Sequence, residues 1–158
     1  MNRVCDHNHR AIVTPLIAAL LRIDRHLPYI LVVNNELAPG ISRTRSYVTT
    51  LEMRARQLAR DVFSTPAMIG LMERTCVELV EPYLDENEQT VGIHVDVRHL
   101  AATDIGQSVT VIAELLEVKG NKLRYSVTAT NDQNVKIGDG MHRRAVINTT
   151  RFAKRSES

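Results

Sequence analysis

One long amphipathic helix followed by four strand-like stretches is the feature that most constrains this chain. Residues 63–84, FSTPAMIGLMERTCVELVEPYL, carry apolar side chains at helical spacing. These side chains share one face: Met68, Met72, Cys76, Leu79, Val80 and Tyr83. Thr65 suits an N-cap and Pro66 suits the first turn, so a helix is predicted from about Pro66 to Leu84.

Strand signals follow this helix in close succession. Four stretches are rich in β-branched residues or alternate in polarity: 90–100, 108–120, 121–132 and 136–152. Gly120-Asn121 predicts a two-residue hairpin turn, and a further strand is predicted at 42–53, ahead of the helix. This order indicates an α+β fold with an antiparallel sheet wrapped around one long central helix, the hotdog architecture. The free edge of such a sheet predicts a homodimer or a higher homo-oligomer.

The chain of 158 residues has the length of one domain with an extension. The turn-rich stretch NNELAPGIS, residues 34–42, marks the boundary. We therefore expect an N-terminal extension at 1–38, the hotdog domain at 39–155 and a short tail at 156–158.

The N-terminal extension contains an apolar stretch at 11–21, with a helix expected from about Thr14 to Arg25. The stretch is too short to span a bilayer. Three explanations stay open: a helix that packs on the domain or on a partner subunit, a signal peptide, and an upstream start outside the working protein.

Composition narrows the classes of function. The net charge is +2, from 20 basic and 18 acidic residues, and the chain has no Trp, which does not favour nucleic acid as a partner. Cys5 and Cys76 lie far apart in different contexts, which favours free thiols in a reducing cytoplasm over the alternative of a disulfide between them. Neither CxxC, HExxH nor a phosphate-binding Gly-rich loop occurs, so neither a metal nor a separate cofactor is expected.

Three residues carry candidate chemistry, each with a purely structural alternative. Glu73 lies about 80° from the centre of the apolar helix face, where an ion pair would be a sufficient explanation. His99 ends a strand face predicted to include Val91, Ile93, Val95 and Val97, where it could be a buried histidine bonded to a backbone carbonyl. Thr65 could be only a helix cap. Together, a hydroxyl, a carboxylate and an imidazole near a helix start suit acyl transfer or hydrolysis.

Three segments in this order resemble the fluoroacetyl-CoA thioesterase-like hotdog proteins over roughly residues 40–153. They are STPAMIGLMERTCVELVEPYL, VGIHVDVRHLAATDIGQSVTVIAEL and IGDGMHRRAVINTTRF. The resemblance implies Thr65, Glu73 and His99 as the catalytic set and Gly92 as part of the acyl pocket. It implies hydrolysis of a short-chain or small substituted acyl-CoA thioester, with no metal or redox cofactor and with no membrane partner.

Further contacts with the substrate are expected from Phe63, Met72 and Arg143. Candidates for the CoA phosphates are Lys119, Lys122, Arg143, Arg144 and Arg151, each of which could equally be a solvated surface residue. Arg56 and Ala59 occupy the positions at which the fluoroacetate-specific enzyme of this family carries lid phenylalanines. Fluoroacetyl specificity is therefore not expected.

Three other functions compete with thioester hydrolysis. A non-catalytic acyl-CoA-binding module, such as a sensor, would not need Thr65, Glu73 and His99 together. A hotdog hydratase typically carries Asp and His close together in one loop, and this chain has no such loop. A structural dimerisation domain would need the pocket to be filled by its own side chains.

Overall fold

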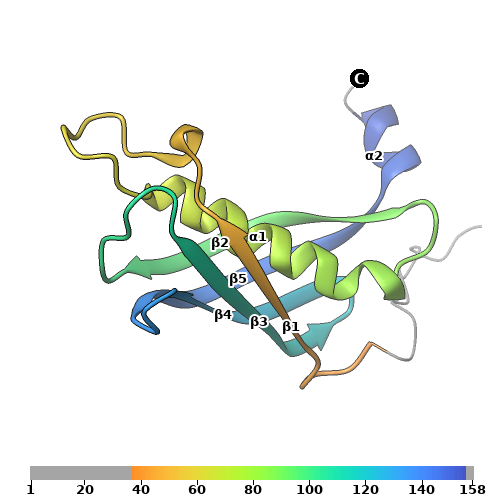
Figure 1. Ribbon diagram of the computed structural model, residues 1–158. Coiled ribbons are helices and arrows are strands. Elements are labelled where there is room, and N and C mark those ends of the chain that lie inside the picture. The colour runs from red at the N-terminus through yellow and green to blue at the C-terminus, as the bar shows by residue number, and fades with distance from the viewer. Residues whose placement is uncertain (1–36, 156–158) are drawn as a thin grey trace, which may run out of the picture.

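The computed structural model describes residues 37–155, so the expected N-terminal helix and the tail lie outside the described residues. Figure 1 shows one long helix lying across a single curved sheet. The strands and helices are β1 (Ser42–Val48), α1 (Thr65–Val80), β2 (Glu88–His99), β3 (Ser108–Lys119), β4 (Lys122–Asn131), β5 (Lys136–Asn148) and α2 (Thr149–Arg155).

The sheet has five strands in the order β1-β3-β4-β5-β2, and the neighbouring strands pair antiparallel. The predicted antiparallel sheet with one long helix is therefore confirmed. The β3–β4 hairpin turns at Gly120, whose φ of 58° favours glycine, as the sequence predicted. Strands β1 and β2 are the two edges of the sheet.

The core lies between α1 and the concave face of the sheet. The helix contributes its predicted apolar face, on which Met68, Met72 and Cys76 are fully buried. Alternate residues of β3 and β4 meet this face, because successive strand residues point to opposite sides of the sheet. The most deeply buried of these strand residues are Val109, Val111, Ala113, Leu115, Leu123, Tyr125, Val127 and Ala129.

Several predicted boundaries are wrong by a few residues, and each has a local cause. The first strand stops at Val48, and Leu51–Met53 forms a 3-10 turn instead. The α-helix stops at Val80, and the Glu81–Tyr83 turn that contains Pro82 is 3-10, which fits the missing N–H of proline. The last strand ends at Asn148, after which α2 begins.

The start of α1 also differs from the prediction. Ser64 is the N-cap, and its side chain accepts a 3.3 Å hydrogen bond from the backbone N–H of Ala67. Thr65 is the first residue of the helix. The interpretation of Thr65 as the cap is therefore wrong, and the Thr65 hydroxyl is available for another partner.

A β-bulge interrupts β2 and changes which side chains face the helix. The pairing with β5 shifts between Gly92 and His94, so Ile93 is an extra residue. We predicted one continuous face from residue 91 to residue 99. The bulge instead places Gly92 opposite Arg144, and it leaves Ile93 49% exposed.

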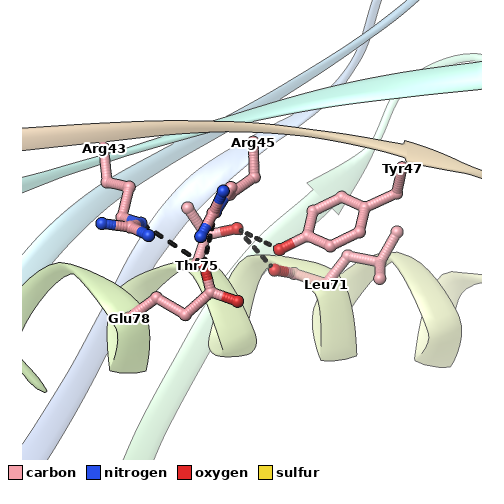
Figure 2. Close-up of polar contacts among 6 residues, drawn as sticks. All are labelled: Arg43, Arg45, Tyr47, Leu71, Thr75 and Glu78. Carbon is pink, nitrogen blue, oxygen red and sulfur yellow. Dashed lines mark hydrogen bonds and ion pairs between the residues drawn. The ribbon is translucent and has the colours of Figure 1, made fainter.

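Polar contacts attach β1 to α1. Figure 2 shows Arg43 and Arg45 of β1 converging on the Glu78 carboxylate of the helix. The hydrogen bond from Arg45 contributes most to lowering the pKa of Glu78. Nearby, the Tyr47 hydroxyl lies 3.1 Å from Thr75 Oγ1 (Figure 2). These contacts hold one sheet edge against the helix with charged side chains.

Candidate functional site

The first turn of α1 brings Thr65 against the end of β2. Thr65 Oγ1 lies 2.9 Å from Nδ1 of His99, within hydrogen-bond distance. The other ring nitrogen of His99, Nε2, is buried and has no partner among the described residues. The structure therefore brings two of the three predicted catalytic residues together, at a helix N-terminus where free N–H groups create positive potential.

A cavity of about 710 Å³ opens beside this pair. Thr65, His99 and Phe63 line it, together with residues 54–58 of the connector between β1 and α1. Figure 1 shows this connector projecting past the N-terminal end of α1. The volume of the cavity falls within the usual range for sites that bind small molecules, about 300–1,000 Å³. Phe63 lines the cavity but is only 2% exposed, so its contact with substrate stays a prediction.

Glu73 pairs with Arg144, a residue that the sequence suggested as a contact for the CoA phosphates. Arg144 Nη1 donates a 2.6 Å hydrogen bond to Glu73 Oε1. The Arg144 side chain is 3% exposed and that of Glu73 is 44% exposed. The remaining Arg144 nitrogens bond Thr90: Nε to its hydroxyl at 2.9 Å and Nη2 to its carbonyl at 2.7 Å. A rigid, buried guanidinium thus orients a carboxylate that still reaches solvent.

Gly92 lies directly beside this ion pair. A Cβ atom at this position would be 3.1 Å from Glu73 Oε1 and 3.4 Å from Cε1 of His142. The missing side chain therefore lets the Glu73 carboxylate lie close against the β2 backbone. The predicted acyl-pocket glycine lies next to the predicted catalytic carboxylate because the β2 bulge places it on the concave face.

Behind Glu73 lies a group of buried polar side chains. His142 and Tyr125 are fully buried. Among the described residues, neither the ring nitrogens of His142 nor the hydroxyl of Tyr125 has a hydrogen-bond partner. Burial, aided by the charge of Arg144, lowers the pKa of His142. Burial also raises the pKa of Tyr125, and it raises that of the Cys76 thiol to about 12. These groups are held in their neutral forms beneath the ion pair.

Within one chain, Glu73 does not reach the Thr65–His99 pair. Glu73 lies eight positions after Thr65 in the helix, which corresponds to about 12 Å along the axis. His99 lies seven positions after Gly92 in β2, a span of about 23 Å. Within a single chain the three predicted catalytic residues therefore do not converge on one point. Thr65 and His99 form one group at the C-terminal end of β2, and Glu73 lies beside Gly92 near the middle of the strand.

The other predicted substrate contacts divide between core and surface. Met72 is fully buried in the core, so it supports α1 and does not line a described cavity. Arg144 is bound to Glu73 and Thr90, so it is not a contact for CoA phosphates. The two-residue alternation of β5 could have indicated that Arg144 points into the core, since it shares a strand face with the buried Val146.

Arg143 points away from Glu73, because neighbouring residues of a strand face opposite sides of the sheet. It lines a second cavity, of about 530 Å³, together with Lys119 and Lys122. Three of the five candidates for the CoA phosphates thus share one surface hollow. Arg151 is exposed on α2 and does not line this cavity.

Within residues 37–155, no cluster of three or more His, Cys, Asp or Glu side chains is arranged to hold a metal ion. The same part of the chain contains no helix that is both long and apolar enough to cross a membrane.

Comparison with known proteins gives a consistent family. The sequence profile of the FlK family, described as fluoroacetyl-CoA-specific thioesterase, matches residues 46–150. The fluoroacetyl-CoA thioesterase of Streptantibioticus cattleyicolor is 46% identical over 92 residues. These residues are 58% of this chain and 66% of that relative, so the aligned part spans just under two thirds of the relative's length.

Solved structures agree with the fold. A structure of the fluoroacetyl-CoA thioesterase FlK superposes with a TM-score of 0.72 at 35% identity, covering 77% of this chain and 96% of that chain. A thioesterase superfamily member from Thermus thermophilus superposes with a TM-score of 0.72 at 26% identity, covering 78% and 93%. The predicted hotdog fold is confirmed, and this chain belongs to the fluoroacetyl-CoA-specific thioesterase family.

Proposed function

We propose that this chain hydrolyses short-chain or small substituted acyl-CoA thioesters to the free acid and CoA. The observation that carries the proposal is the half-exposed Glu73 carboxylate, which the buried Arg144 orients and which lies beside the backbone of Gly92. Family membership supports the same reaction. Among the relatives, FlK variants have been solved with fluoroacetate and CoA and with acetyl-CoA.

Glu73 and His99 divide the chemistry between them in this proposal. Arg144 occupies Oε1 of Glu73, and no described residue bonds Oε2, which leaves that oxygen to face the thioester or a water molecule. Glu73 attacks the thioester carbonyl or activates water. His99, held by Thr65, accepts a proton from water and returns one to the leaving thiolate. No step of this route requires a metal ion or a separate cofactor.

The substitution Glu73→Gln tests this assignment. Gln keeps the size of the side chain but cannot act as a nucleophile or as a base, so we expect turnover to fall by about a hundredfold or more. Circular dichroism should remain that of the wild type. An unchanged rate of CoA release would contradict the catalytic role of Glu73.

We further propose that a second copy of the chain completes the site. Strand β2 is a sheet edge of 12 residues, and it exposes Ile93 and Val95 at 49% and 42%. A long edge strand with exposed apolar side chains invites pairing with another strand. The opposite edge, β1, is shorter and carries the Arg43 and Arg45 side chains, which discourage such pairing.

Antiparallel pairing of two β2 strands around a two-fold axis would place the His99 end of one copy against the Gly92 half of the other. The Thr65–His99 pair of one copy would then meet Glu73 of the second copy. This arrangement would explain why the Thr65–His99 pair and Glu73 lie so far apart within a single chain. Two identical sites per dimer follow from the symmetry.

Mixing two inactive variants distinguishes a shared site from a site within one chain. Glu73→Gln and His99→Ala are each expected to be inactive as homodimers. After the subunits exchange, half of the dimers are mixed and each has one intact site, so about a quarter of wild-type activity should return. Absence of recovery, with exchange verified by native mass spectrometry, would contradict the shared site.

An acyl-CoA substrate and the free, buried thiol of Cys76 support a cytoplasmic location.

The alternative function is binding without catalysis. An acyl-CoA sensor of this fold would bind acyl-CoA without releasing CoA, and Glu73→Gln would then leave its measured behaviour unchanged. Assays of CoA release with a series of acyl-CoA substrates, from acetyl to long-chain and including haloacetyl, separate the two functions and define the size of the acyl pocket.

A further inference from the structure

The cavity beside Thr65 and His99 has a one-sided charge. Its connector wall carries Arg54 and Arg56, and neither Asp nor Glu is among the described residues that line it. The N-terminus of α1 opens onto the same cavity and adds positive potential. A ligand group that enters here therefore meets cationic side chains, and in the described chain it meets no carboxylate on the cavity wall.

The three arginines of the connector differ in their partners. Arg60 donates a 2.6 Å hydrogen bond to Asp104, and Arg54 lies 3.5 Å from Asp61. Arg56 forms no ion pair within the described chain, although it lines the cavity. Its guanidinium is thus the cavity cation whose charge is not balanced by a neighbour in residues 37–155.

We propose that Arg56 binds an anionic group of the thioester substrate, so that this cavity selects substrates by charge. The inference rests on the proposed thioesterase function and adds a class of substrate to it. A guanidinium pairs with carboxylate and phosphate oxygens through parallel N–H bonds, which suits both anions. An acyl-CoA offers two sources of such a group: the phosphates of CoA, and a carboxylate at the far end of a dicarboxylic acyl chain.

Four substrates separate these sources. Acetyl-CoA and succinyl-CoA both carry the CoA phosphates, and succinyl-CoA adds an acyl carboxylate. The corresponding N-acetylcysteamine thioesters keep the acyl group and the thioester but lack the phosphates. The variant is Arg56→Gln, and Arg56→Lys tests rescue by charge. The matched control is Arg60→Gln, which removes a charge from the same connector at a residue that does not line the cavity.

The expected result for Arg56→Gln is a rise of about tenfold in KM with little change in kcat, since a charged hydrogen bond to the substrate is lost. A rise in KM for the two CoA substrates, but not for the two N-acetylcysteamine thioesters, identifies the CoA phosphates as the bound group. A rise in KM for the two succinyl substrates, but not for the two acetyl substrates, identifies the acyl carboxylate. In either case Arg56→Lys should recover part of the affinity, and Arg60→Gln should resemble the wild type.

Two results would overturn the inference. Arg56→Gln could match Arg60→Gln on all four substrates, or it could raise KM equally for all four, including the uncharged acetyl-cysteamine thioester. Failure of the proposed function is recognised separately, because the wild type would then hydrolyse none of the four. In that event, calorimetric binding of acetyl-CoA and succinyl-CoA to the wild type and to Arg56→Gln decides the inference without turnover: equal affinities overturn it.

Discussion

Arg144 donates a 2.6 Å hydrogen bond to Glu73 across 71 positions of the sequence, and the arginine is buried while the carboxylate is half exposed. The pair therefore differs from a surface salt bridge, in which both partners are solvated. The carboxylate keeps access to substrate, and Thr90 keeps the guanidinium in place. Glu73 occupies the border of the apolar helix face because this cation lies beneath it.

Removing the cation should affect both stability and turnover. Arg144→Met leaves the buried carbonyl and hydroxyl of Thr90 without their donor, so the free energy of unfolding should fall by about 1–3 kcal/mol. Glu73 should also lose its orientation, which lowers kcat. Urea unfolding and a double-mutant cycle with Glu73→Gln measure the coupling, expected at about 1 kcal/mol. Strictly additive effects would show that the two residues do not depend on each other.

The two hydroxyl residues at the start of α1 should separate stability from activity. Ser64→Ala removes the cap that accepts from Ala67, so the free energy of unfolding should fall by about 1 kcal/mol while turnover is retained. Thr65→Val removes the hydroxyl that holds His99, so turnover should fall by about a hundredfold with little loss of stability. Thermal denaturation and CoA release measure the two effects. The reverse pattern would make Thr65 the structural residue.

His142 should make stability depend on pH. Burial lowers its pKa in the folded protein, whereas an unfolded histidine titrates near its usual value of about 6.5. Below that pH the unfolded chain binds a proton that the folded chain does not, so stability falls as the pH falls. His142 should contribute up to about 1 kcal/mol per pH unit between pH 6.5 and 5.5.

Urea unfolding at these two pH values measures this dependence. His142→Gln should reduce the slope relative to the wild type. An equal slope in the wild type and in His142→Gln would contradict the assignment to His142.

Cys76 should be unreactive in the folded protein. Burial raises the pKa of its thiol to about 12, and the thiolate is the reactive form. Iodoacetamide at pH 8 should leave Cys76 unmodified until the chain is unfolded in urea, and peptide mass spectrometry distinguishes it from Cys5. Rapid labelling under native conditions would show that this part of the core opens.

Local patterns were sufficient to predict the order of the long helix and the strands, although not all of their boundaries. The helical spacing of Met68, Met72 and Cys76 predicted the buried face, and the Gly120-Asn121 turn predicted the hairpin. Glu73 stood out because its angle on the helix follows from helix geometry alone. The resemblance to a family, drawn from three segments in order, is confirmed by the match to residues 46–150.

Tertiary structure decided which of these residues meet. The bulge at Ile93 moved Gly92 to the concave face, and pairing of β2 with β5 placed Arg144 beneath Glu73. The separation of Glu73 from the Thr65–His99 pair also appears only in three dimensions. The physical reason is that periodicity sets the direction of a side chain within one element, whereas contacts between elements depend on strand register. One extra residue in a strand moves every later side chain to the opposite face of the sheet. No local pattern in this sequence indicated the extra residue.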